Sequence, residues 1–291
     1  MSAIIKTGIC SFGLSGKVFH APFIHAHPGF ELTGIVERHN NDSKAKYPQA
    51  KVFRSVEELC ADKNIELVIV NTPGYLHFEH AKAALLAGKN ILVEKPFTIS
   101  VKEAEELIEL AEKQKLQITI YQNRRYDGDY RAVKNIIEKK LLGELRFVEV
   151  NYNRFRPKYG GKPHKEGDLP GAGNLYDLSP HMVDQVLQLF GWPMAIFADI
   201  WKMRDDVIAP DYFNLIFYYE KLRVHLSATS ISREPTWGYI LHGMKGSLFD
   251  DLYKFLTGQG KNPVLPEDGL KTVKIIEAAF QSANAGKIIS L

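Results

Sequence analysis

The stretch GICSFGLSGKVFHAPF, residues 8–23, follows an apolar, β-branched run at residues 4–10 and leads into a predicted helix. Glycines at the turn from a first strand to a first helix are typical of a phosphate-binding site. The dinucleotide pattern G-x-G-x-x-G requires glycine at positions 11, 13 and 16, but this chain has Ser11, Gly13 and Gly16. Gly13 would let the backbone approach a pyrophosphate, and Gly16 would let helix and strand pack closely. The stretch is therefore a damaged nucleotide site, a variant of one, or a tight turn.

Strands and helices alternate through the first 120 residues. Apolar runs predict strands at residues 4–10, 30–36, 67–70, 91–93 and 117–121. Two capping boxes, Ser55 with Glu58 and Ser100 with Glu103, mark helix starts, and Gly88 would close a helix over residues 75–87. This alternation with short links predicts a Rossmann-type, doubly wound α/β domain with a parallel sheet and right-handed crossovers.

The pattern changes near residue 123. Helices are expected at residues 127–142 and 180–190, and strands at residues 145–152, 195–203, 212–219, 223–230 and 239–243. Residues 157–173 are rich in Gly, Pro and Lys, so we expect them to be too polar to pack and to form a mobile loop. These features predict a C-terminal α+β domain with a large, mostly antiparallel sheet. We therefore predict two domains, residues 1–122 and 123–291.

The bulk composition indicates that the chain can form a packed core and that its net charge is small. The chain has 291 residues, of which 45% are apolar, and its formal charge of +3 is spread without a block of like charge. This argues against a nucleic-acid or membrane-surface partner. We recognise no signal peptide and no apolar run long enough to span a membrane, so we expect a cytoplasmic location. The only cysteines, Cys10 and Cys60, do not suggest a disulfide framework.

Two charged residues follow the second predicted strand. Glu37 could hydrogen-bond the ribose hydroxyls of NAD, whereas Arg38 could hold the 2′-phosphate of NADP. The choice between the two cofactors therefore stays open. An exposed charge pair after a strand is the alternative interpretation.

The stretch NILVEKPF, residues 90–97, places Glu94, Lys95 and Pro96 directly after a buried strand. A lysine at the carboxyl end of a parallel strand points into the ligand crevice, where it can donate to a substrate oxygen and favour a developing alkoxide. Pro96 would fix the turn that presents it. Alternatively, Lys95 extends to solvent at a strand end.

The stretch GAGNLYDLSPHMVDQVLQLF, residues 171–190, contains a second polar group. Ser179 is a good N-cap and Pro180 suits the first helical position, so we expect a helix from Pro180, with Asp177 just ahead of it. His181 and Asp184 would share the face opposite the buried stripe. A histidine near carboxylates can act as a general base. Alternatively, these residues form a polar cluster that caps the helix.

Together, these stretches resemble the glucose-fructose oxidoreductase/inositol dehydrogenase/MocA (Gfo/Idh/MocA) family over almost the whole chain. The resemblance is carried by Glu94-Lys95-Pro96 and by the pattern G-x-G-x-L-x-D-x-x-x-H at residues 171–181. The stretches FGLSGKVFHAPF, YQNRRYDGDY and NYNRFRP are similar to the branch that holds NADP-type scyllo-inositol dehydrogenases. That branch accepts a residue other than glycine at position 11, which implies that Ser11 belongs to a variant nucleotide site.

The resemblance implies an NAD(P)-dependent dehydrogenase that transfers hydride between a hydroxyl carbon of a polyol or sugar, inositol-like, and nicotinamide. It implies that His181 takes the hydroxyl proton, that Asp177 orients His181 or shares its work, and that Lys95 favours the deprotonated oxygen. It assigns cofactor binding to Ser11, Phe12, Gly13, Leu14, Ser15, Gly16, Glu37, Arg38, Asn71, Thr72, Pro73, His77, Glu94 and Lys95. It assigns substrate binding to Asn123, Arg124, Tyr152, Arg154, Asp177 and His181. The second domain would bind the substrate and assemble the chain into a homodimer or homotetramer.

Two other functions and a metal site are the alternative interpretations of the sequence. A non-catalytic sensor could bind a dinucleotide on the same fold, and an enzyme could use NAD transiently for elimination or glycoside cleavage. The presence of both Lys95 and His181 favours an enzyme. His77 and His80 are spaced as two metal ligands on a helix would be, but no cysteine or paired carboxylate completes a set, so no metal is expected.

The carboxyl end departs from the family pattern. The family usually has some tens more residues between the last predicted strand and the stretch LYKFLTG, residues 252–258. The chain has either a genuine deletion or an omitted segment near residues 249–252, and we expect an omission. The missing residues would border the substrate crevice.

Overall fold

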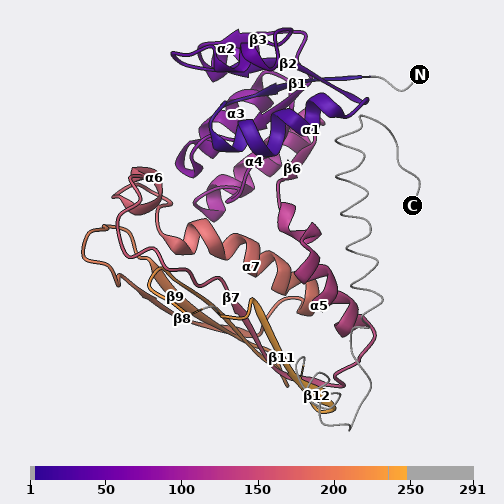
Figure 1. Ribbon diagram of the computed structural model, residues 1–291. Coiled ribbons are helices and arrows are strands. Elements are labelled where there is room, and N and C mark those ends of the chain that lie inside the picture. Colours follow the sequence, from indigo (N-terminus) through magenta and orange to yellow (C-terminus); the bar gives the residue numbers. More distant parts are fainter. Residues whose placement is uncertain (1–3, 235, 248–291) are drawn as a thin grey trace, which may run out of the picture.

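The computed structural model describes residues 4–234 and 236–247. Two six-stranded sheets lie at opposite ends of this part of the molecule, with helix α7 (Asn174–Phe190) between them (Figure 1). The expected segment near residues 249–252 lies outside the described residues. Within the described ranges, no helix combines the length and apolar character of a membrane span.

The first sheet is parallel throughout and has the strand order β3-β2-β1-β4-β5-β6. Its strands are β1 (Ile5–Ile9), β2 (Phe30–Val36), β3 (Lys51–Phe53), β4 (Leu67–Val70), β5 (Asn90–Val93) and β6 (Ile118–Ile120). The order reverses between β1 and β4, which creates a crevice at the carboxyl ends of these two strands. The predicted Rossmann-type domain is confirmed.

Helices cover both faces of the first sheet. They are η1 (Gly16–His20), α1 (Ala21–Ala26), η2 (Asp42–Ala45), α2 (Val56–Ala61), η3 (Gly74–Leu76), α3 (His77–Leu86) and α4 (Val101–Gln114). One apolar cluster includes Ile9 and Ile35 and packs on α1, and another includes Val68 and Val93 and packs on α2 to α4. Burial on both faces explains why these strands read as continuous apolar runs.

Both predicted capping boxes are confirmed. The side-chain oxygens of Ser55 and Ser100 accept hydrogen bonds from the backbone N–H groups of Glu58 and Glu103. Gly88 has φ +74°, as a residue that ends a helix in the left-handed conformation should.

The second sheet has the order β12-β11-β7-β10-β9-β8. Its strands are β7 (Leu145–Asn151), β8 (Ala195–Trp201), β9 (Tyr212–Tyr218), β10 (Arg223–Thr229), β11 (Tyr239–Gly243) and β12 (Gly246–Ser247). Only the pair β7 and β10 is parallel, so the prediction of a mostly antiparallel sheet is confirmed. The helices η4 (Asn123–Tyr126), α5 (Gly128–Glu138) and α6 (Pro163–Glu166) complete this half with α7. The domain division at residues 122 and 123 stays a prediction.

One face of the second sheet packs against α7. Phe213 on β9 and Leu226 on β10 are fully buried, together with Met182 and Val186 of the helix. Along β9 and β10, the residues that alternate with the buried ones face the other side of the sheet and are partly exposed. The helix is therefore held by apolar packing on its sheet side, which positions its amino-terminal end near the first domain.

The predicted start of α7 is wrong, because the helix begins at Asn174 and contains Pro180. Ser179 does not cap it, since its hydroxyl donates to the Leu175 carbonyl oxygen at 2.5 Å. Instead, the Asn174 backbone N–H donates to the carbonyl oxygen of Pro210 at 2.9 Å. A proline removes one helical hydrogen bond, and the helix continues through Pro180 despite that loss. Asp177 therefore lies inside the helix, one turn before His181.

The expectation that residues 157–173 do not pack is also wrong. Arg204, which is 5% exposed, binds this stretch to the second sheet. Its guanidinium donates to Glu166 Oε1 at 2.9 Å and to the carbonyl oxygens of Arg156 and Lys158. The same group donates to Asp211 Oδ2 at 2.6 Å. One buried cation thus binds Glu166 and two carbonyl oxygens at the start of this stretch, a contact that composition could not reveal.

Candidate active site

Two connected grooves follow the carboxyl edge of the first sheet. The first, of about 890 Å³, lies between the glycine turn after β1 and the end of β2. The second, of about 1580 Å³, extends from the ends of β4 and β5 to the amino-terminal part of α7. Gly13, Thr72 and Pro73 line both grooves. They form one continuous cleft at the position where doubly wound sheets bind ligands.

The glycine turn is preformed for a dinucleotide. A Cβ at Gly16 would lie 2.1 Å from the Ser11 carbonyl oxygen, so only glycine fits there. Ser11 itself lies outside the left-handed region, which explains why a non-glycine residue is accepted at this position. The Asn71 amide donates to the Ser11 carbonyl oxygen at 2.8 Å and holds the turn. The Oδ1 atom of Asn71 is buried without a partner, so a free acceptor lines the cleft where a cofactor would bind.

The two charged residues after β2 have different roles. The Glu37 carboxylate is buried and accepts the backbone N–H groups of Asp42 at 2.8 Å and Ser43 at 2.9 Å. Arg54 donates to the Glu37 carbonyl oxygen at 2.8 Å and braces the same loop. Arg38 lines the groove, is exposed, and has no hydrogen-bond or ion-pair partner within residues 4–234 and 236–247. The free charge here is therefore positive.

Lys95 and Asp177 meet across the two domains. Lys95 Nζ lies 3.1 Å from Asp177 Oδ1 and also donates to the Asp177 carbonyl oxygen. Lys165 Nζ approaches the same carboxylate oxygen at 2.7 Å. Burial by itself would raise the pKa of Asp177, but the two lysines outweigh burial and hold it well below its usual value. Burial lowers the pKa of Lys95, and the charge of Asp177 opposes that shift.

His181 lies one helical turn after Asp177, on the same face of α7. It lines the second groove and is 8% exposed, and its buried Nδ1 atom has no hydrogen-bond partner. Burial, followed by the charges of Lys95 and Arg124, lowers the pKa of His181 to about 3. The imidazole is therefore neutral at neutral pH and has lone-pair capacity for a proton.

A cluster that sequence reasoning missed lies beside Lys95. The Glu94 carboxylate accepts the Ser15 hydroxyl at 3.0 Å and lies 2.9 Å from Nε2 of the buried His20. The ring of His20 packs on that of Tyr121 at 4.5 Å. The structure therefore ties the glycine turn to the residue before Lys95. No local signal indicates this contact, because 74 residues separate His20 from Glu94.

Three residues assigned to binding lie outside the cleft lining. Gly16 packs against Ser11, as described above. His77 is buried, and its ring nitrogens lie 2.6 Å from the Pro96 carbonyl oxygen and 2.8 Å from that of Thr72. It therefore supports the loops that follow β4 and β5. Tyr152 places its ring 5.1 Å from the Arg124 guanidinium. The other assigned residues line one groove or both: Ser11, Phe12, Gly13, Leu14, Ser15, Glu37, Arg38, Asn71, Thr72, Pro73, Glu94, Lys95, Asn123, Arg124, Arg154, Asp177 and His181.

The stretch expected to be a mobile loop supplies part of the opposite wall. Lys162, His164 and Lys165, around α6, line the second groove. They were missed because their spacing has no motif character. The backbone places them: the Gly173 N–H donates to the Lys165 carbonyl oxygen at 2.8 Å.

The paired histidines considered as metal ligands have other contacts. His80 Nδ1 lies 2.9 Å from the Thr72 hydroxyl, and the nitrogens of His77 face backbone carbonyl oxygens. In the part of the chain that the structure describes, no three His, Cys, Asp or Glu residues are grouped to hold a metal ion.

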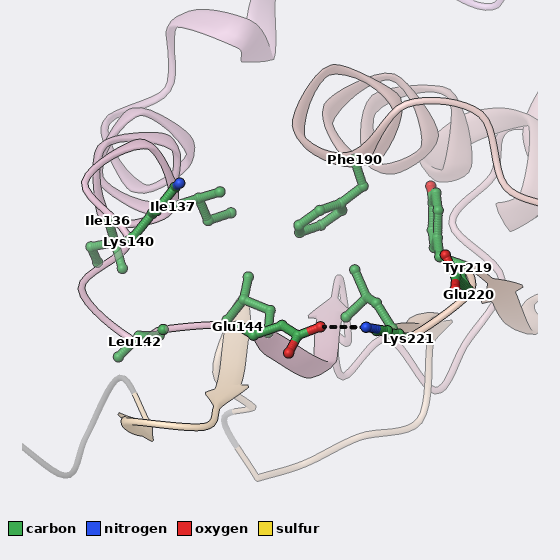
Figure 2. A pocket seen from close by; sticks show the side chains of 12 residues that line it. Ile136, Ile137, Lys140, Leu142, Glu144, Phe190, Tyr219, Glu220 and Lys221 are labelled. Atoms are coloured by element: carbon green, nitrogen blue, oxygen red, sulfur yellow. Dashed lines mark ion pairs between the residues drawn. The ribbon is translucent and has the colours of Figure 1, made fainter.

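A separate cavity of about 850 Å³ lies at the carboxyl-terminal end of α7 (Figure 2). Ile137 of α5, Phe190 of α7 and Leu222 of the β9–β10 turn line it, and Glu144 and Lys221 form an ion pair of 3.9 Å at its edge. Phe190 lies 13 residues after Asp177, about 20 Å along a helix, so this cavity belongs to neither groove.

The strand order, the reversal between β1 and β4 and the preformed glycine turn define a dinucleotide-binding fold. The chain belongs to the Gfo/Idh/MocA family of NAD(P)-dependent oxidoreductases. Residues 5–122 match the family's NAD-binding Rossmann fold, and residues 130–249 match the GFO/IDH/MocA C-terminal domain.

Three relatives illustrate the family. The chain is 38% identical to the uncharacterized oxidoreductase YdgJ of Escherichia coli K12, over 85% of this chain and 71% of that protein. It is 38% identical to the scyllo-inositol 2-dehydrogenase (NADP(+)) IolW of Bacillus subtilis, over 84% of this chain and 68% of that one. A crystal structure described provisionally as an oxidoreductase of Bacteroides fragilis is 36% identical, with a TM-score of 0.75, and covers 99% of this chain and 100% of its own.

Proposed function

We propose that this oxidoreductase oxidises a hydroxyl group of a polyol or sugar, or reduces the corresponding carbonyl. The observation that carries the proposal is the convergence of Lys95, Asp177 and His181 in the cleft that begins at the glycine turn. These three groups can remove a hydroxyl proton and stabilise the oxygen that loses it.

The three side chains divide the work. A bound nicotinamide supplies the hydride acceptor, or the donor in the reverse direction. The neutral His181 accepts the hydroxyl proton, and the positive charge of Lys95 favours the developing alkoxide. Asp177 keeps the ammonium group of Lys95 in place through a 3.1 Å contact. Lys165 shares that carboxylate at 2.7 Å, so Asp177 stays ionised while Lys95 turns toward the substrate.

We propose NADP as the preferred cofactor. The Glu37 carboxylate is 7% exposed and each of its oxygens accepts a backbone N–H group, so its charge already stabilises the loop after β2. The exposed guanidinium of Arg38 suits a 2′-phosphate, since guanidinium groups bind phosphate in a bidentate way. The name of the relative IolW specifies NADP(+).

We also propose assembly into a homodimer or homotetramer through the exposed strand β8. All seven residues of β8 are exposed, and Phe197 and Trp201 on its open face are 53% and 65% exposed. Contiguous exposed apolar side chains mark interaction surfaces. Light scattering would give the mass of the wild type and of Phe197→Glu, which we expect to be monomeric.

The direct test measures reduced nicotinamide by absorbance with each oxidised cofactor and a panel of inositols, aldoses and their carboxylate and phosphate derivatives. Wild type is compared with Lys95→Ala and His181→Ala, and with Lys134→Ala, which changes an exposed lysine on α5, as a control. We expect turnover in the wild type and the control, and loss in both site variants. Tight cofactor binding without turnover on the whole panel would contradict the proposal.

A further inference from the structure

The substrate side of the cleft has an excess of positive charge. Its charged lining groups are Lys95, Arg124, Arg154, Lys162 and Lys165, against the carboxylates of Glu94 and Asp177. A neutral polyol presents only hydroxyl groups, which uncharged hydrogen-bonding side chains can recognise. Gathering like charges in one cleft raises the free energy of each unless an anion compensates them. The lining therefore favours a ligand that is itself negative.

Neither carboxylate is available to neutralise the remaining cations. Glu94 is engaged with His20 at 2.9 Å. Asp177 is shared between Lys95 at 3.1 Å and Lys165 at 2.7 Å, so one negative charge faces two positive ones.

Arg154 is the most notable of the cations without a partner. Its backbone N–H donates to the Thr229 carbonyl oxygen at 2.9 Å, which anchors the residue beside the end of β10. Its guanidinium lines the cleft and, among the described residues, has no hydrogen-bond or ion-pair partner. Burial, and then the charge of Arg156, lower the pKa of Arg154. The protein therefore holds a half-buried cation with five unused N–H donors at this wall.

Two further cations line the same groove as Arg154. Lys162 lines the cleft and forms no ion pair with another residue that the structure describes. Arg124 binds Asp127 at 3.0 Å, lies over the Tyr152 ring and hydrogen-bonds to the Tyr152 side chain, and other donors of its five N–H groups stay free. All three cations follow β6, the last strand of the first sheet, along the chain.

The cofactor does not supply the missing anion. The pyrophosphate of a dinucleotide binds at the glycine turn, which forms the wall of the second groove that the first sheet supplies, whereas Arg124, Arg154 and Lys162 come from elements after β6. The oxidised nicotinamide ring is itself a cation and adds to the positive charge of the second groove.

We propose that the substrate carries a carboxylate or phosphate group and that Arg154, together with Arg124 and Lys162, binds it. The inference rests on the proposed function and narrows its substrates from neutral polyols to acidic sugars or polyols. Guanidinium groups pair with both anions through two parallel hydrogen bonds. A bound anion also offsets the charges of Lys95 and Arg124, which depress the pKa of His181, and so strengthens His181 as a base.

The test compares three ligands that share one ring: D-glucose, D-glucuronate and D-glucose 6-phosphate. Calorimetry measures their binding to the protein saturated with reduced cofactor, in wild type, Arg154→Gln and Arg154→Lys. Arg146→Gln is the matched control, because Arg146 is an exposed arginine on β7 outside both grooves. Unchanged cofactor binding shows that each variant is folded.

We expect at least one of the two anionic ligands to bind at least about tenfold more tightly than glucose. Losing a charged hydrogen-bond partner in Arg154→Gln should weaken that ligand about 10- to 100-fold and leave glucose unchanged. Arg154→Lys should retain part of the difference. The ligand that responds distinguishes a carboxylate from a phosphate.

The inference is overturned if neither anion binds more tightly than glucose, or if Arg154→Gln weakens all three ligands equally. Turnover assays with the same ligands separate this result from the proposed function. Oxidation of neutral sugars without a preference for anions would leave the proposed function standing. Tight, Arg154-dependent anion binding without any nicotinamide reduction would refute the proposed function and leave this inference standing.

Discussion

Replacing Lys95 with methionine should reduce activity strongly without destabilising the fold. Removing one partner of a buried ion pair usually costs about 3–5 kcal/mol, because the other charge is left uncompensated. Here the Asp177 carboxylate keeps Lys165 at 2.7 Å, so no orphaned charge results. Burial lowers the pKa of Lys95, which means that the fold opposes its charge. At pH values below the lowered pKa, Lys95 carries a charge in the folded wild type, and this charge reduces the free energy of unfolding. Lys95→Met has no such charge.

The two effects of Lys95→Met have opposite signs. Loss of one donor to a developing alkoxide should lower kcat/KM about 100- to 1000-fold, or about 2.7–4 kcal/mol. The free energy of unfolding should stay equal or rise by up to about 1 kcal/mol, which corresponds to a Tm increase of about 2 °C for a chain of this size.

The assay combines reduced-nicotinamide absorbance with thermal melting at several pH values. The exposed Lys134→Met serves as the control. A fall in Tm of several degrees would show that the Lys95–Asp177 contact is a net stabiliser and would refute the electrostatic argument. A loss of kcat/KM below about tenfold would refute the role of Lys95 at the reacting oxygen.

Four further predictions concern the glycine turn, Arg38 and His181. Gly16→Ala should destabilise the fold by more than about 2 kcal/mol, because its Cβ would lie 2.1 Å from the Ser11 carbonyl oxygen. Gly13→Ala meets only Ser11 Oγ at 3.4 Å, so chemical denaturation should show a nearly unchanged fold while the cofactor Kd rises at least about tenfold. Arg38→Ala should raise the KM for NADP about 10- to 100-fold and leave that for NAD unchanged, and an equal rise for both would argue against a 2′-phosphate contact. Because the pKa of His181 is lowered to about 3, the free energy of unfolding of the wild type should fall as the pH falls from about 6.5 towards 3. Thermal melts at several pH values should show a smaller loss of stability for His181→Gln. Parallel curves for the two proteins would contradict this prediction.

The parts of the fold that depend on residues close together in the sequence could be predicted from the sequence. The strands of the first sheet read as apolar runs because both of their faces are buried. The caps at Ser55 and Ser100 were predicted because each acts on a residue three positions away. The position of Lys95 after β5 was also predicted correctly, because it depends only on where the preceding apolar run ends.

The start of α7 could not be predicted in this way. Local preference favoured Ser179 as cap and Pro180 as first residue, whereas the helix begins at Asn174. The deciding hydrogen bond comes from Pro210, which is 36 residues further along the chain.

The sequence by itself determined the doubly wound first domain and the glycine turn, because each rests on a short pattern, and the family resemblance made Lys95, Asp177 and His181 the candidate site residues. Only the tertiary structure decided which charges are free. It directed the Glu37 carboxylate to backbone N–H groups and left Arg38 exposed. It placed the unpaired Arg154 opposite the cofactor turn, and this electrostatic balance depends on distances between residues that are far apart in the chain.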